Sequence, residues 1–331
     1  MVVVVNEPPT APAKHTAANQ ETFAQLEGAY GAGERIAGNI TRRVHPVGTL
    51  VTIDRTAAHS IPSKQGVGLA RKIGFDFALA AATQTGSDVA YLHGTDADAL
   101  LPRDYFVVDP GAAAIVHPFR HLAEGTDGET VFAYEASLRY YVAGLRYAGS
   151  AYAFHTIGSL VSVSPQAYAA VRGVPKRNGA EDFYLLNKVA KVGHVGTTTG
   201  EPVRLSGRRS DRVPFGTGPA VTKFKSRTDA MMCPVYNPAL FQEVQSAVAD
   251  NPGLDAFQTL KLVHRLRDEQ YPNVPLREAL QAAPFFKSTP SGTAQGVCEQ
   301  FAQMEHSAAL TSSHLRDGDR TRTSTLTSAA G

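Results

Sequence analysis

Two aspartates that stand two positions apart, Asp96 and Asp98, are the residues whose spacing most directly suggests chemistry. They follow an apolar run at residues 89–92 that is expected to form a strand. In an extended segment side chains alternate between two faces, so both carboxylates would project to the same side. Carboxylate oxygens suit Mg²⁺ and Mn²⁺, and such ions keep positions for water and substrate phosphates. The pair indicates a divalent-metal site for a diphosphate, with a solvated loop as the alternative.

A second acidic pair, Glu181 and Asp182, begins a predicted helix directly after a glycine-containing turn at residues 177–179. Carboxylates in the first turn of a helix interact favourably with its amide dipoles, so the pair could be structural. A carboxylate can also take the proton from an attacking hydroxyl group. The residues alone leave both interpretations open.

A segment with two glycines and a basic pair precedes the aspartates. Gly66 and Gly68 allow close approach of the backbone, and Arg71 and Lys72 place positive charge at the opening of the following helix. This arrangement indicates one side of a binding site for a diphosphate or for the base of a nucleotide. An ordinary loop with surface charges is the alternative.

Further polar residues stand beside predicted strands. Asn6, Glu7 and Asp54 follow the carboxyl ends of two strands expected to be parallel, where ligands bind in open α/β sheets. His155 precedes another strand and could orient a sugar or be a structural histidine. Residues 208–218 combine charges and glycines, which suits a loop that closes on phosphate or a solvated hinge.

Strands and helices are expected to alternate, which predicts an α/β fold with a mainly parallel sheet. Strands are expected at residues 2–5, 50–53, 89–92, 112–116, 160–163 and 203–205. Helices are expected at residues 18–30, 67–83, 129–148, 166–171 and 181–192, and within 237–283. Tyrosines along the helix at 129–148 are predicted to pack in the core. Residues 307–331 have almost no apolar side chains and are predicted to be disordered.

Composition narrows the class of protein. The 331 residues are 43% hydrophobic, enough for a full α/β core, and the net charge of +2 argues against a dedicated nucleic-acid binder. Cys233 and Cys298 are too few for a disulfide framework and fit a reducing, cytoplasmic setting. No apolar segment is long enough to span a membrane, so we expect a soluble protein with at most peripheral membrane contact.

The order of these motifs resembles that of the family 2 glycosyltransferases, which have the GT-A fold. The matching segments are residues 2–7, 53–54, 66–74, 95–98 and 179–183. The resemblance implies a GT-A domain, a Rossmann-like and mainly parallel sheet flanked by helices, over residues 1–220. A helical C-terminal extension at 221–306 and a disordered tail at 307–331 would follow it. The implied activity is an inverting, metal-dependent transfer of sugar from a UDP- or GDP-linked donor to a saccharide or other hydroxyl-bearing acceptor.

The resemblance also implies a role for each matching residue. Asp98 would bind Mg²⁺ or Mn²⁺ directly, and Asp96 would face the donor's ribose or the waters of the metal. Asp182 would be the catalytic base, with Glu181 as its alternate. The remaining matches would contact the donor: Asn6, Glu7, Asp54, Gly68, Arg71 and His155.

The chain departs from the family pattern in two places. It has no histidine at 208–218 to act as a third metal ligand, and it reads Asp54-Arg55-Thr56-Ala57 where the family usually has paired acids and a Gly-Ser. Two alternatives therefore stay open. One is a sugar-phosphate nucleotidyltransferase, although residues 6–10 lack its glycine-rich basic loop; the other is a GT-A-like binding module without activity.

Overall fold

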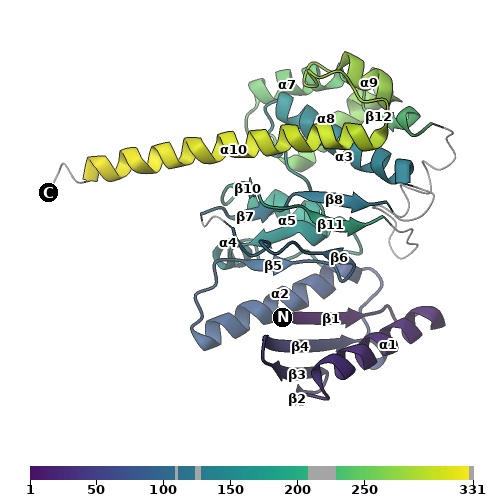
Figure 1. The fold of residues 1–331 in the computed structure, drawn as a ribbon, viewed down its shortest axis with the longest axis vertical. Coiled ribbons are helices and arrows are strands. Elements are labelled where there is room, and N and C mark those ends of the chain that lie inside the picture. The colour runs from purple at the N-terminus through teal and green to yellow at the C-terminus, as the bar shows by residue number, and fades with distance from the viewer. Residues whose placement is uncertain (109–110, 124–127, 208–228, 328–331) are drawn as a thin grey trace. The chain divides into compact units, whose positions relative to one another are not determined.

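The structure is a computed structural model (Figure 1) that describes residues 1–108, 111–123, 128–207 and 229–327, with side chains as far as residue 311. The segment at 208–218 that we expected to close on phosphate lies outside this range. The chain divides into two compact units. Unit 1 contains Met1–Asp96, Pro110–Ala114 and Thr156–Val195, and unit 2 contains Ala97–Asp109, Ile115–His155 and Gly196–Gly331.

Unit 1 begins with a sheet of four strands in the order β1-β4-β3-β2. The strands are β1 (Val2–Asn6), β2 (Glu34–Ala37), β3 (Ile40–His45) and β4 (Gly48–Arg55). The predicted parallel pairing of the first and second expected strands is confirmed, with Val2 opposite Val51 and Asn6 opposite Arg55. The antiparallel hairpin of β2 and β3 was not expected from the sequence.

Two long helices belong to unit 1, α1 (Ala13–Tyr30) and α2 (Gly66–Thr85). Helix α2 packs on β1 and on β5 (Leu92–Gly94), where Phe75 lies against Gly94. Strand β5 pairs antiparallel with β9 (Val161–Val163) in a second sheet of order β10-β7-β9-β5. One helix therefore covers a strand from each sheet.

The remaining elements of this part of the chain are short. Strands β7 (Ala114–Val116) and β10 (Val195–Thr197) complete the second sheet. In each of these strands the first residue belongs to unit 1 and the next residues belong to unit 2. The 3-10 turns η1 (Ala57–His59) and η3 (Gly158–Leu160) and the helices α4 (Pro165–Ala170) and α5 (Glu181–Val189) connect the strands.

Unit 2 combines small sheets with helices. Strand β11 (Val203–Ser206) lies between β6 (Ala99–Leu100) and β8 (Phe119–Leu122), and β12 (Pro234–Val235) pairs with β13 (Val274–Pro275). The helices are α3 (Gly128–Tyr147), α7 (Leu240–Asp250), α8 (Ala256–Glu269), α9 (Leu276–Ala282) and α10 (Ala294–Thr327). The 3-10 turn η4 (Ala230–Met232) precedes β12.

Helix α3 is the centre of the unit 2 core. Its Tyr140 is fully buried against the rings of Phe241 and Phe285, as the predicted packing of the tyrosines requires. Helix α10 packs on α3 through buried residues that include Phe301. Helix α3 thus buries its apolar face together with the C-terminal helices of unit 2.

The C-terminal segment differs from the expectation based on composition. The backbone of residues 307–327, predicted to be disordered, continues helix α10. The helix begins at Ala294 within the packed core, so its costly first turns are already formed, and each further residue adds one hydrogen bond to an existing helix.

Candidate functional site

Arg71 on helix α2 brings together acidic residues from distant segments of unit 1. Its Nη2 donates to Asp96 Oδ1 at 2.6 Å, its Nε to Glu181 Oε1 at 3.0 Å, and its Nη1 to the carbonyl oxygen of Gly158 at 2.7 Å. The Arg71 side chain is only 13% exposed, whereas that of Asp96 is 47% exposed. The guanidinium group thus joins the segment after β5 to the beginning of α5.

Gly68, one turn before Arg71, holds α2 close to the segment that leads into α5. Its amide donates to the carbonyl oxygen of Arg177 at 2.9 Å. A Cβ atom at this position would lie 2.3 Å from the carbonyl oxygen of Pro175, so any other residue would push this segment away. Gly68 therefore acts here through backbone packing, which also sets the position of Glu181 beside Arg71.

The charges in this group shift one another. Burial acts to lower the pKa of Arg71, but the carboxylates of Asp96 and Glu181 outweigh it and hold that pKa above its ordinary value. Burial raises the pKa of Asp182 to about 6, and the charge of Glu181 adds to the rise, while the hydrogen bond from the Phe183 amide at 2.7 Å opposes it. A partly exposed carboxyl group that ionises near neutral pH is suited to proton transfer.

Asp96 and Asp98 do not lie in the extended segment that the sequence predicted. Strand β5 runs from Leu92 to Gly94 and not over residues 89–92, and Asp98 lies in a turn before β6. Strand alternation therefore gives no reason for the two carboxylates to share a face. Asp96 belongs to unit 1 and Asp98 to unit 2. Their spacing in the sequence is therefore the reason to expect that both bind one metal ion.

The residues offer at most a partial set of metal ligands. Within the described ranges, no group of three or more His, Cys, Asp or Glu side chains is placed to hold a metal ion. Asp96 and Asp98 are both exposed, and each offers hard carboxylate oxygens. Proteins usually bind Mg²⁺ through one or two carboxylates, with the other positions filled by substrate phosphates and water.

The strand-end residues lie at one edge of the first sheet, as expected for Asn6, Glu7 and Asp54. Asn6 is exposed. Glu7 is buried, and its carboxylate accepts hydrogen bonds from the Ala57 amide at 2.9 Å and from Asn19 Nδ2 at 3.0 Å. The bond from Ala57, more than the opposing effect of burial, lowers the pKa of Glu7. In this arrangement Glu7 ties α1 and η1 to the end of β1.

Asp54 is near the end of β4, and its side chain holds the turn that follows the strand. Its Oδ1 accepts from the amide of Thr56 at 2.8 Å and from the Thr56 hydroxyl at 2.7 Å. Asp54 also lines a cavity of unit 1 that is described below.

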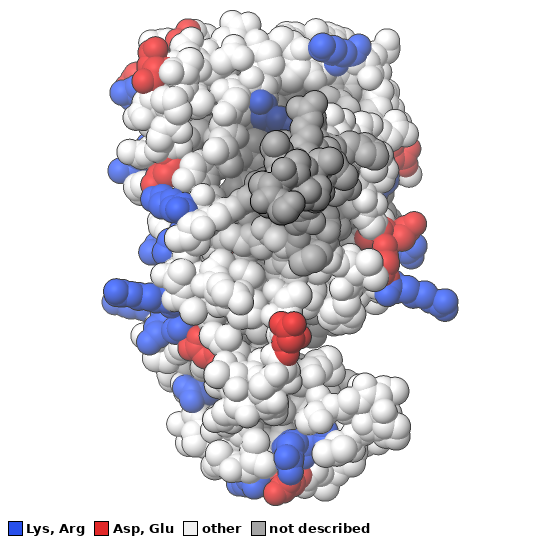
Figure 2. All heavy atoms as spheres, turned by 90° about the vertical axis from the view of Figure 1, so that its left-hand side faces the viewer, with Lys and Arg blue, Asp and Glu red and all other residues white. Residues whose placement is uncertain are grey.

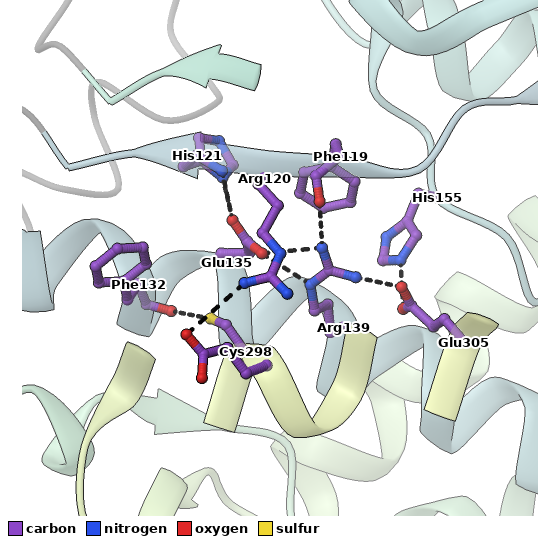
Figure 3. A network of polar contacts seen from close by, with 10 residues as sticks. Phe119, Arg120, His121, Phe132, Glu135, Arg139, His155, Cys298 and Glu305 are labelled. Atoms are coloured by element: carbon purple, nitrogen blue, oxygen red, sulfur yellow. Dashed lines mark hydrogen bonds and ion pairs between the residues drawn. The ribbon is translucent and has the colours of Figure 1, made fainter. Parts of the chain in front are cut away.

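His155 belongs to unit 2, where it lies in a buried polar network (Figure 3). Its Nε2 is 2.8 Å from Glu305 Oε1 on α10, and its ring packs edge-on against Phe119 with 5.0 Å between ring centres. Glu305 also pairs with Arg139 of α3. These contacts tie His155 to α10 and favour the structural alternative for this histidine.

Arg139 and Glu135 form the centre of this network, which the sequence analysis missed. Arg139 donates to Glu135 Oε1 at 2.9 Å and to the carbonyl oxygen of Phe119 at 2.5 Å. Glu135 Oε2 accepts from the amide of His121 at 2.7 Å. The only sequence signal was the spacing of Glu135 and Arg139, four residues apart on a predicted helix.

Two further observations concern the charges on the surface and the apolar length of the helices. On the face drawn in Figure 2, Lys and Arg side chains lie among Asp and Glu side chains and do not form one basic patch. In the part of the chain that the structure covers, no helix is both long enough and apolar enough to cross a bilayer.

Comparison of the chain with family models, with curated proteins and with solved structures gives no match.

Proposed function

We propose that this protein is an inverting glycosyltransferase that moves a sugar from a UDP- or GDP-linked donor to an acceptor hydroxyl group. The observation that carries the proposal is the group around Arg71, in which Asp96 and Glu181 share one guanidinium and the neighbouring Asp182 has a pKa of about 6. In unit 1, α2 packs on both β1 and β5, and this packing of a helix on strands supports a GT-A-like arrangement.

The donor side of the reaction requires positive charge. When the sugar leaves, the nucleoside diphosphate gathers negative charge, and groups already aimed at it lower the barrier. Arg71 keeps its charge at all relevant pH values, and each of its two terminal nitrogens has one N–H group beyond those that donate to Asp96 and Gly158, so both can still donate to phosphate oxygens. Asp98 and Asp96 would hold Mg²⁺ or Mn²⁺, which neutralises part of the charge on the leaving diphosphate.

The acceptor side requires a base. Asp182 takes the proton of the acceptor hydroxyl while that oxygen attacks the anomeric carbon and the bond from this carbon to the diphosphate breaks. Glu181 is the weaker choice for this role because its Oε1 already accepts from Arg71. Instead, the charge of Glu181 helps to raise the pKa of Asp182 toward neutrality.

A binding panel tests the proposal. Thermal unfolding is measured with UDP, GDP, TDP and CDP, each with and without Mn²⁺. One nucleotide at a hundred times its dissociation constant should add about 2.7 kcal/mol of stability, and only when Mn²⁺ is present. Asp98→Ala should remove this gain, and Asp88→Ala, a change of an exposed aspartate before β5, should keep it.

Hydrolysis of the matching nucleotide sugar then separates the alternatives. A transferase should hydrolyse it slowly in the presence of Mn²⁺, whereas a binding module without activity would bind and not hydrolyse it. If none of the four nucleotides stabilises the protein, the proposal is wrong.

A further inference from the structure

A cavity of about 280 Å³ lies in unit 1 beside the unexpected β2–β3 hairpin. Its lining comes from α1, from the strands β2 to β4 and from η1. Because side chains alternate along a strand, Thr41 and Arg43 of β3 lie on one face, as do Thr52 and Asp54 of β4. The lining residues are Phe23, Arg35, Gly38, Asn39, Thr41, Arg43, Thr52, Asp54 and His59.

Arg43 is built into the wall of this cavity. The residue is only 6% exposed, its Nε donates to the carbonyl oxygen of Gly31 at 2.7 Å, and its Nη1 donates to Thr52 Oγ1 at 3.0 Å. Gly33 makes room for the stem of this side chain, because a Cβ there would lie 2.6 Å from Arg43 Cγ. Within the residues that the structure describes, Nη2 of Arg43 has no hydrogen-bond partner. A cation that is almost fully buried is thus held in place by two of its five N–H groups, which leaves N–H groups of this side chain available to a ligand.

The balance of charges and donors in the cavity favours an anion. Arg35 and Arg43 bring two positive charges against one negative charge, that of Asp54. Oxygen Oδ1 of Asp54 already accepts two hydrogen bonds from Thr56, which reduces its capacity to balance the arginines. The hydroxyl group of Thr41 adds a further donor to the lining.

We propose that this cavity binds a small phosphate monoester, with the phosphate group on Arg43 and Arg35. A phosphate group has three terminal oxygens and up to two negative charges, so it can accept from Nη2 of Arg43 and from the fork of Arg35 at once, whereas a carboxylate has only two oxygens to share. The hydroxyl-bearing remainder of the ligand faces Thr41 and Asp54. The cavity volume of about 280 Å³ lies just below the usual range for ligand pockets, about 300–1,000 Å³, so the occupant is small.

This site is separate from the group around Arg71. None of the residues Arg71, Asp96, Glu181 and Asp182 lines the cavity. The inference therefore goes beyond the proposed transferase activity and does not depend on it.

Titration calorimetry with inorganic phosphate and with ribose 5-phosphate, in low salt and without a divalent ion, tests the inference. The wild-type chain should bind ribose 5-phosphate more tightly than inorganic phosphate. Arg43→Gln and Arg35→Gln should each weaken binding tenfold or more, about 1.4 kcal/mol. Arg42→Gln is the matched control. Arg42 directly precedes Arg43 in β3, so its side chain points to the opposite face, where it pairs with Glu34 at 2.6 Å. Arg42→Gln should change the affinity less than twofold.

The variants also separate this site from the proposed active site. Arg35 is exposed, so Arg35→Gln should fold normally and decides the result even if Arg43→Gln proves unstable. Equal affinity in all variants, or no binding of either probe at millimolar concentration, would overturn the inference. It would also be overturned if Arg71→Gln abolished binding of ribose 5-phosphate while Arg35→Gln did not.

Discussion

Replacement of Glu135 by glutamine should destabilise unit 2 in a way that depends on pH. Glu135 is fully buried, and its carboxylate accepts hydrogen bonds from His121 and Arg139. Burial acts to raise the pKa of Glu135, but the hydrogen bonds from His121 and the charge of Arg139 outweigh it and lower the pKa from 4.5 to about 2. The folded state therefore holds the ionised form much more tightly than the unfolded state does.

The size of the effect follows from the pKa of Glu135. Each pH unit by which folding lowers a pKa is worth about 1.36 kcal/mol, so the ionised carboxylate contributes roughly 3 kcal/mol to the free energy of unfolding at neutral pH. Because the folded pKa lies below the unfolded one, this contribution is complete above pH 4.5 and is lost as the pH falls toward about 2. At about pH 3.5 roughly 1.4 kcal/mol of it should be gone.

Urea unfolding followed by far-UV circular dichroism measures this effect, and that signal is suitable because the chain has no tryptophan. The difference in unfolding free energy between wild type and Glu135→Gln should shrink as the pH is lowered from 7 to about 3.5. Glu299→Gln is the control, since the Glu299 side chain is 47% exposed and 3.9 Å from Arg120. A difference that does not depend on pH, or an equal loss in Glu299→Gln, would refute the reasoning.

Three further predictions concern the group around Arg71. Arg71→Gln should weaken a nucleoside diphosphate at least tenfold more than the nucleoside in calorimetry, because only the diphosphate carries the phosphates. Turnover should fall as the pH drops below about 6, where Asp182 becomes protonated. Glu181→Gln should shift this acidic limb of the pH–rate profile to lower pH, because the substitution removes a charge that raises the pKa of Asp182. In thermal unfolding, Gly68→Ala should destabilise the protein by about 1–3 kcal/mol through overpacking, while Gly28→Ala, with open space around the new Cβ, should stabilise it by up to about 1 kcal/mol.

Much of the α/β organisation of unit 1 could be predicted from its hydrophobic pattern. The valine run of β1 and the apolar core of β4 gave the parallel pair, and the small residues of α2 gave the helix. The β2–β3 hairpin was missed because its two strands are rich in arginine and mostly exposed, which hides the usual alternation. The dipeptide Gly38-Asn39 between them was the turn signal that could have revealed it.

The candidate site was predictable in part. The positions of Glu181 and Asp182 at the start of a helix followed from turn chemistry and apolar spacing, and α5 confirms them. The contacts of Arg71 with Asp96 and of His155 with Glu305 could not be predicted, because each joins segments that are far apart in the sequence. The extended arrangement expected for Asp96 and Asp98 was wrong, since a short strand gives way to a turn before Asp98.

The most direct test of the proposed transferase is a comparison of nucleotide binding and turnover in Asp182→Asn. The side chain keeps its shape and loses its basic oxygen, so the dissociation constant of the nucleoside diphosphate should stay within about twofold while turnover falls by about two to four orders of magnitude. Asp88→Asn, at an exposed position outside the group around Arg71, should turn over at the wild-type rate. If Asp182→Asn also turns over at that rate, Asp182 is not the base, and the proposed mechanism is contradicted.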